Sequence, residues 1–106
     1  MYLLDRLRVR PILITELGYS PEKADLFLDH FPLLSDQLVE AVEVWLEDRK
    51  ILDVKVEDIS IRQVMELHNC NFLNAVRGLN ELLSLPLSAE DRESLKRFYS
   101  TRMRQV

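Results

Sequence analysis

The chain has 106 residues, 47% of them hydrophobic and 30% charged, and a net charge of −4 at pH 7. This composition is typical of a globular protein of one domain or two very small ones, and it excludes a disordered chain. The single cysteine, Cys70, excludes an intramolecular disulfide, and no stretch reaches the roughly 18 apolar residues that a membrane span needs. Because residues 1–10 also lack the continuous apolar run of a signal peptide, we expect a cytoplasmic protein that does not contact a membrane.

Helix starts and ends are marked along the chain by residues with strong preferences for those positions. Serines at N-caps accept hydrogen bonds from the first free amides, and glycine or asparagine adopts the left-handed backbone that ends a helix. The residues of these two kinds are Ser20 (followed by Pro21), Ser35 and Ser88, then Gly18 and Asn69. The apolar residues between them recur with helical spacing, so we expect helices near residues 2–8, 11–17, 21–31, 36–49, 60–67, 72–83 and 89–103. The predicted fold class is all-α, a small helical bundle.

The segment between the predicted helices at 36–49 and 60–67 is expected to be extended. Residues 52–57 alternate apolar and polar side chains, which is typical of a short edge strand. After it, Ser60 and Gln63 have the spacing of a capping box, in which each side chain binds the backbone N–H of the other residue. The next helix is therefore predicted to begin with a side-chain cap at Ser60.

The predicted helix at 36–49 is apolar over more than one face. Its main stripe consists of Leu38, Ala41, Val42, Trp45 and Leu46. Val39 and Val44 widen that stripe, and a helix that apolar is either wedged between neighbours or presents a contact surface. Val39 and Val44 are therefore candidates for binding another protein or a second copy of the chain.

Two similar patterns follow each other along the chain. The matching pairs are Glu16-Leu17 with Glu66-Leu67, Ala24 with Ala75, and Leu28 with Leu79. They predict two tandem three-helix units, residues 1–50 and 59–106, joined by an extended connector at 51–58. Shared apolar spacing alone also produces such matches, so a duplication and a chance likeness both stay open.

Residues that carry catalysis or bind cofactors are sparse in this sequence. It contains no phosphate-binding glycine loop, nucleophile elbow or H-E-x-x-H motif. His68 and Cys70 supply only two of the three or four ligands that zinc needs, and pairing Cys70 with His30 or His68 leaves no third group to orient a nucleophile. We therefore expect no enzyme, no metal, no cofactor and no small-molecule substrate.

The region around the first glycine carries the turn Leu17-Gly18-Tyr19 and, downstream, Ala41-Val42 followed by Trp45-Leu46. In these residues the segment 11–48 resembles the ubiquitin-associated (UBA-like) three-helix family, which has a Met-Gly-aromatic turn after its first helix and an Ala-Val-x-x-Trp-Leu ending in its third. The resemblance implies a three-helix fold and a small apolar patch that binds ubiquitin or another protein. The patch residues it assigns are Leu17, Gly18, Tyr19, Trp45 and Leu46. The alternative is that Tyr19 and Trp45 are core residues of a bundle.

Residues 59–79 combine a helix start at Ser60-Ile61-Arg62-Gln63, the polar turn His68-Asn69-Cys70-Asn71 and a second helix from Phe72. This pattern is similar to the helix-turn-helix of bacterial transcription regulators. There, a capped helix, a short turn and a second helix place polar side chains in the major groove of DNA. The resemblance implies that Asn71, Asn74 and Arg77 contact bases, and that Arg62 and a basic cluster including Arg97 contact phosphates. The alternative is an ordinary helical hairpin with a polar turn.

The negative net charge argues against general affinity for nucleic acid. Phe72 and Leu73 also begin the supposed recognition helix, where exposed polar residues are needed. The sequence therefore favours a non-enzymatic protein-interaction module, an adaptor or scaffold that binds another protein or itself, over a DNA-binding regulator.

Overall fold

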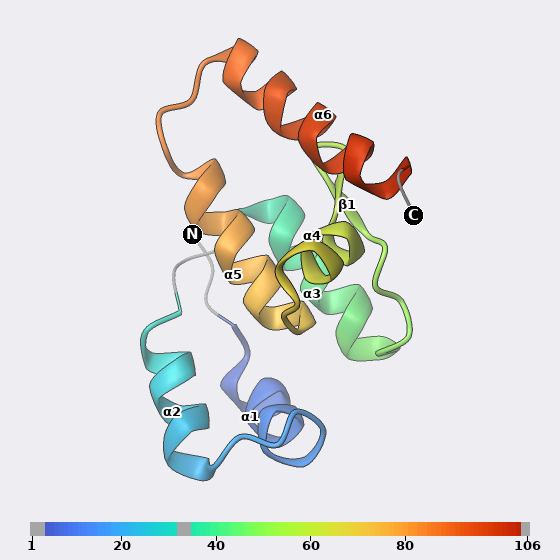
Figure 1. Cartoon of the computed structure of the whole chain (residues 1–106). Coiled ribbons are helices and arrows are strands. Elements are labelled where there is room, and N and C mark those ends of the chain that lie inside the picture. Colours follow the sequence, from blue (N-terminus) through green and yellow to red (C-terminus); the bar gives the residue numbers. More distant parts are fainter. Residues whose placement is uncertain (1–3, 32–34, 105–106) are drawn as a thin grey trace.

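Six α-helices and one two-stranded sheet make up the computed structural model, which describes residues 4–31 and 35–104 (Figure 1). In chain order they are α1 (Arg6–Thr15), α2 (Pro21–Asp29), α3 (Asp36–Glu47), β1 (Lys55–Val56), β2 (Ile59–Ser60), α4 (Ile61–His68), α5 (Phe72–Leu83) and α6 (Ala89–Arg104). The prediction of an all-α fold is confirmed, with one very short β-hairpin added. Five of the predicted helices match α2 to α6 within two residues at each end.

Capping side chains fix where most of these helices begin. The Ser20 hydroxyl accepts a hydrogen bond from the Lys23 N–H at 3.1 Å, and Pro21 occupies the first turn of α2. Ser88 and Asp91 form a reciprocal box at α6, with each side chain accepting from the other backbone N–H at 3.1 and 3.4 Å. These bonds satisfy amides that the first turn leaves without partners.

The first helix differs from the prediction. Two helices were expected near residues 2–8 and 11–17, whereas α1 runs without a break through Pro11; residues 2 and 3 lie outside the described residues. The side chains of Val9, Ile12 and Leu13 fall on one face across the proline and are all buried. Their burial outweighs the single backbone hydrogen bond that Pro11 removes.

The start of α4 also differs from the prediction. Ser60 belongs to β2, its side chain is buried, and it makes no capping hydrogen bond. Ser60 pairs with Lys55 across a two-residue turn in which Glu57 and Asp58 both have positive φ, at 49° and 67°. Such a turn matches the twist of a hairpin, so Ser60 has the backbone of a strand and its side chain faces the core.

Helix α5 lies at the centre of the molecule (Figure 1). It packs against α4 and α3, while α6 crosses over α4 and β2 and α1 pairs with α2. The Trp45 ring of α3 stacks on the Phe72 ring of α5, with centroids 5.1 Å apart and planes 6° from parallel. Buried side chains from all six helices and the hairpin form one hydrophobic cluster.

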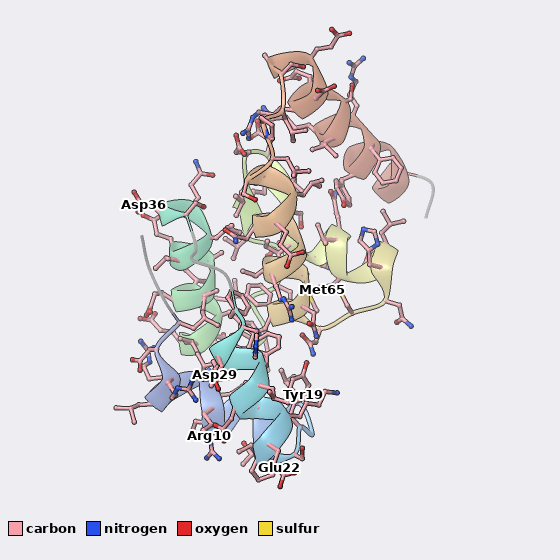
Figure 2. The ribbon with its side chains drawn as sticks, turned by 90° about the vertical axis from the view of Figure 1, so that its left-hand side faces the viewer. Arg10, Tyr19, Glu22, Asp29, Asp36 and Met65 are labelled. Carbon is pink, nitrogen blue, oxygen red and sulfur yellow. The ribbon has the colours of Figure 1, made fainter. Side chains whose placement is uncertain are left out.

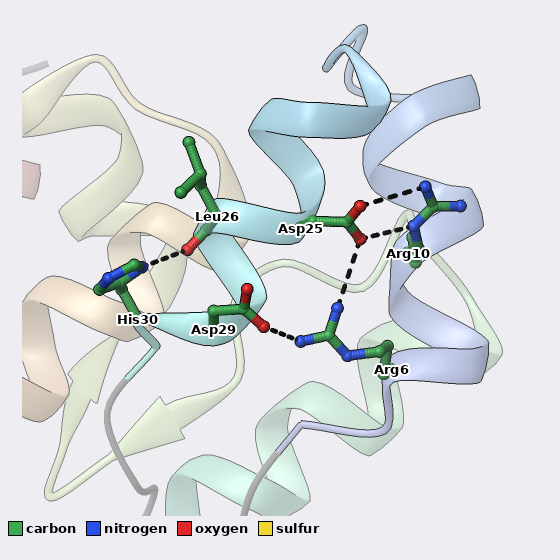
Figure 3. Close-up of polar contacts among 6 residues, drawn as sticks. All are labelled: Arg6, Arg10, Asp25, Leu26, Asp29 and His30. Atoms are coloured by element: carbon green, nitrogen blue, oxygen red, sulfur yellow. Dashed lines mark hydrogen bonds and ion pairs between the residues drawn. The ribbon is translucent and has the colours of Figure 1, made fainter.

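An arginine–aspartate cluster joins the outer faces of α1 and α2 (Figure 3). The Arg10 guanidinium donates to Asp25 at 2.8 Å, and Arg6 bridges Asp25 (3.3 Å) and Asp29. The side chains of the cluster are 39–55% exposed, and ion pairs exposed to this degree contribute little to the stability of a fold. The cluster links the two helices at the surface, while Val9, Leu13, Ala24 and Phe27 are buried on their inner faces.

The contacts of α3 and α6 bear on the predicted tandem units. Helix α3 packs mainly against α5 and β1, which come from the second half of the chain, and α6 packs against α4 and β2. The division at residues 51–58 and the duplication therefore stay predictions, because the two halves share a single core.

Candidate functional site

The turn that follows α1 packs against the second half of the chain. Gly18 adopts the left-handed φ of 75°, and the Tyr19 N–H donates back to the Leu13 carbonyl at 2.9 Å. This geometry aims the Tyr19 hydroxyl at α5, where it accepts hydrogen bonds from the side-chain amides of Asn71 (3.3 Å) and Asn74 (2.9 Å). Figure 2 shows Tyr19 between the α1–α2 hairpin and the second half. Tyr19 is therefore half-buried and bound within the chain.

The polar face of α5, which the helix-turn-helix resemblance assigned to DNA bases, faces this same turn. Asn71 also caps α5 by accepting from the Asn74 N–H at 2.9 Å. Arg77 lies over the Phe27 ring of α2, 5.7 Å from its centroid, and pairs with Glu81 at 3.6 Å. The two surfaces that the sequence suggested as alternative binding sites thus contact each other inside one molecule.

The remaining residues of the predicted protein-binding patch divide between core and surface. Trp45 is 2% and Leu46 7% exposed, so both are core residues and add no area to an exposed patch. Leu17 and Val39 are half-buried against the core, whereas Gly18 is exposed and Val44 is 37% exposed. The structure therefore places Trp45 in the core, which is the alternative that the sequence left open.

Arg62 and Arg97, both assigned to phosphates, lie on different helices. Arg62, on α4, is exposed and pairs with Glu66 at 3.1 Å. Arg97, on α6, is exposed and makes no ion pair among the described residues. The side-chain amides of Asn71 and Asn74 bind Tyr19 instead.

A groove of about 570 Å³ opens between α4, α5 and α6. Apolar residues and one glycine form most of its lining. Its polar members are the side chains of His68 and Asn74, the Cys70 thiol and the Tyr99 hydroxyl. The lining residues are Val64, His68, Cys70, Asn74, Ala75, Gly78, Leu79, Leu82 and Tyr99. Its volume falls within the range of about 300–1,000 Å³ that is usual for ligand sites. The groove is the principal candidate site.

Three polar groups gather where α4 ends and α6 crosses it. The His68 Nε2 and the Tyr99 hydroxyl are hydrogen-bonded at 3.2 Å, and their rings meet edge to face. Burial raises the pKa of the Cys70 thiol, and burial together with the nearby Cys70 charge raises the pKa of Tyr99. A raised pKa keeps the thiol protonated near neutral pH, whereas a nucleophilic cysteine needs the thiolate. This end of the groove is therefore suited to hydrogen bonding.

Comparisons with protein-family models, curated proteins and solved structures found no match to this chain. Within residues 4–31 and 35–104, no group of three His, Cys, Asp or Glu is placed to hold a metal ion. In that same part of the chain, no helix combines the length and apolar character that crossing a membrane requires. The function of the groove is inferred from its own geometry and chemistry.

Sequence reasoning missed the groove as a site. His68, Cys70 and Asn74 were considered for metal binding, catalysis or base contacts, and Tyr99 was not considered. One local signal was present: Gly78 lies in the middle of α5, where glycine costs about 1 kcal/mol relative to alanine. Apart from the backbone of α5 itself, a Cβ built on Gly78 has no described atom within 4 Å, so packing among the described residues does not require glycine there.

Proposed function

We propose that this protein is a non-enzymatic interaction module that docks an apolar segment of a partner protein into the α4–α5–α6 groove. The observation that carries the proposal is the composition of the lining, which contains no Asp, Glu, Lys or Arg among the residues whose side chains the structure describes. The chain as a whole is 30% charged. Two other hollows of the described surface are lined by charged residues, which are Asp36, Glu57 and Arg92 in one and Lys50, Asp53, Arg62 and Glu66 in the other.

An exposed aromatic side chain on α6 lies next to Tyr99, which lines the groove. Phe98 is 43% exposed and packs edge to face on Tyr99, with ring centroids 5.3 Å apart. Concave apolar surface beside an exposed aromatic side chain is typical of sites that bind proteins. These features support docking of a segment longer than one residue.

DNA binding receives less support from the same geometry. Helix α5, which would enter the major groove, has six buried side chains and is the central helix of the molecule. Its Asn71 and Asn74 amides are bonded to Tyr19. Reading bases would require these bonds to break and the α1–α2 hairpin to move away.

The proposal is tested by blocking the groove without unfolding the chain. Gly78→Leu places a side chain in the open space over α5, and leucine favours a helix more than glycine does. Glu81→Leu is the matched control, because it adds the same side chain one turn along α5, outside the lining. Partners captured from extracts of the producing cells are identified and purified, and their affinities for the three forms are measured.

We expect Gly78→Leu to weaken binding of the purified partner at least tenfold, while Glu81→Leu leaves it within about twofold. The folded state of each variant is checked by circular dichroism. Equal binding by all three forms would place the partner elsewhere on the surface and refute the proposal.

A further inference from the structure

The polarity of the groove changes along its length. On α5 the lining runs from Asn74 through Gly78 to Leu82, which spans about 12 Å of helix. The His68–Tyr99 hydrogen bond lies at the α4 end. A complementary group therefore has an apolar body for the Gly78–Leu82 end and one hydrogen-bonding tip for the His68–Tyr99 end.

Charge narrows the choice of group further. Buried anchors at protein interfaces are most often tryptophan, tyrosine or arginine. An arginine here would bury its guanidinium without a carboxylate, because no acidic residue is among the described residues that line the groove. The two aromatic anchors with a polar tip remain.

Hydrogen-bonding capacity separates these two. His68 Nε2 and the Tyr99 hydroxyl exchange donor and acceptor roles with the histidine tautomer. A phenol hydroxyl both donates and accepts, whereas an indole N–H only donates. A phenol can therefore hydrogen-bond to the His68–Tyr99 pair whichever histidine tautomer is present.

We propose that the groove holds a tyrosine side chain of the partner segment, with its ring over Gly78 and its hydroxyl at the His68–Tyr99 pair. This inference rests on the proposed function. The space needed for the ring is available because, apart from the backbone of α5 itself, no described atom lies within 4 Å of a Cβ built on Gly78. The ring also has apolar contacts from Leu79 and Leu82 on the same helix.

The test uses p-cresol, which is the tyrosine side chain alone, with toluene and indole as the comparison probes. Each is titrated into the ¹⁵N-labelled full-length protein, and amide shifts are followed. We expect p-cresol to shift Gly78 and the residues around His68 saturably, and to bind about fivefold tighter than toluene, the effect of one net hydrogen bond of about 1 kcal/mol. Gly78→Leu abolishes these shifts, and Glu81→Leu keeps them.

A second variant tests the role of the polar tip. Tyr99→Phe keeps the ring that lines the groove and removes only the hydroxyl. It is expected to lower the affinity for p-cresol about fivefold while leaving the affinity for toluene unchanged. Loss of both affinities would show that Tyr99 only shapes the groove, and would overturn the assignment of the tip.

The remaining outcomes also decide the question. Unsaturable shifts, shifts that survive Gly78→Leu, or equal affinities for p-cresol and toluene overturn the tyrosine assignment, and so does tighter binding of indole. These results leave the proposed function intact if Gly78→Leu still weakens partner binding. Conversely, if Gly78→Leu leaves the affinity for the partner unchanged, the proposed function is refuted, whatever the result of the p-cresol titration.

Discussion

Asp25 lies between two arginines of α1, and its pKa follows from that position (Figure 3). The hydrogen bond from Arg10 is the largest cause that lowers the pKa of Asp25, with charge attraction from Arg10 and Arg6 adding to it; desolvation opposes both. A carboxyl group whose pKa is lower in the folded protein than in the unfolded chain stabilises the fold above the unfolded value of about 3.9. That stabilisation is lost as pH falls through the folded pKa.

Asp25→Asn therefore has a pH-dependent effect. At pH 7 the variant is expected to unfold at lower urea concentration than the original protein, because both bonds to Arg10 lose their charge. The difference should shrink as pH falls from about 4, where Asp25 of the unfolded chain becomes protonated, through the lower pKa of Asp25 in the folded protein. Urea titrations at pH 7, 5 and 3 measure this, with Glu40→Gln as a control that removes an exposed carboxylate on α3. A difference that is constant with pH would show that charge at Asp25 is not what matters.

At the scale of elements, the neighbouring residues Val44 and Trp45 of α3 lie in different environments. Trp45 is buried and stacked on Phe72, whereas Val44 is 37% exposed. Trp45→Ala is expected to lower the free energy of unfolding by about 3–5 kcal/mol, and Val44→Ala by less than about 1 kcal/mol. Urea unfolding followed by circular dichroism measures both. A small effect of Trp45→Ala would contradict the core position of this ring.

The same comparison bears on self-association through α3, which stays a prediction. Val39 is half-buried against the core, so Val39→Asp disturbs packing as well as the surface. Val44→Asp changes mainly exposed area and is the cleaner test of association by light scattering.

Local sequence signals predicted elements where one residue alone sets the backbone. Ser20, Ser88 and Asn69 fall at the helix ends assigned to them, because capping and left-handed backbone depend on near neighbours. The interpretation failed at Pro11 and Ser60. In both places burial against distant parts of the chain decided the outcome.

At the scale of the whole molecule, Tyr19 connects the two halves. Its hydroxyl bonds to amides 52 and 55 residues further along the chain. Tyr19→Phe is expected to cost about 1 kcal/mol of stability, and combining it with Asn74→Ala should cost less than the sum of the two single changes. Urea unfolding of the four forms in a double-mutant cycle measures the coupling. Strict additivity would show that this junction is absent in solution.

The sequence could not predict that its two candidate sites bind each other. The Leu17–Tyr19 turn and the Asn71–Arg77 face each looked free, because spacing along a chain does not say which exposed faces meet. The groove was missed for the same reason, since its lining comes from α4, α5 and α6 and exists only once α6 crosses α4. Gly78 was the one local sign that space is left open there.

Photo-crosslinking from the groove tests the docking surface most directly. p-Benzoylphenylalanine is placed at position 82, which lines the groove, or at position 81, which does not. The complex with the partner is then irradiated, and the fraction of the partner that is crosslinked to the chain is quantified by mass spectrometry. Docking in the α4–α5–α6 groove predicts strong crosslinking from position 82 and weak crosslinking from position 81. Equal crosslinking from both, or crosslinking only from a probe at position 44 on α3, would contradict it.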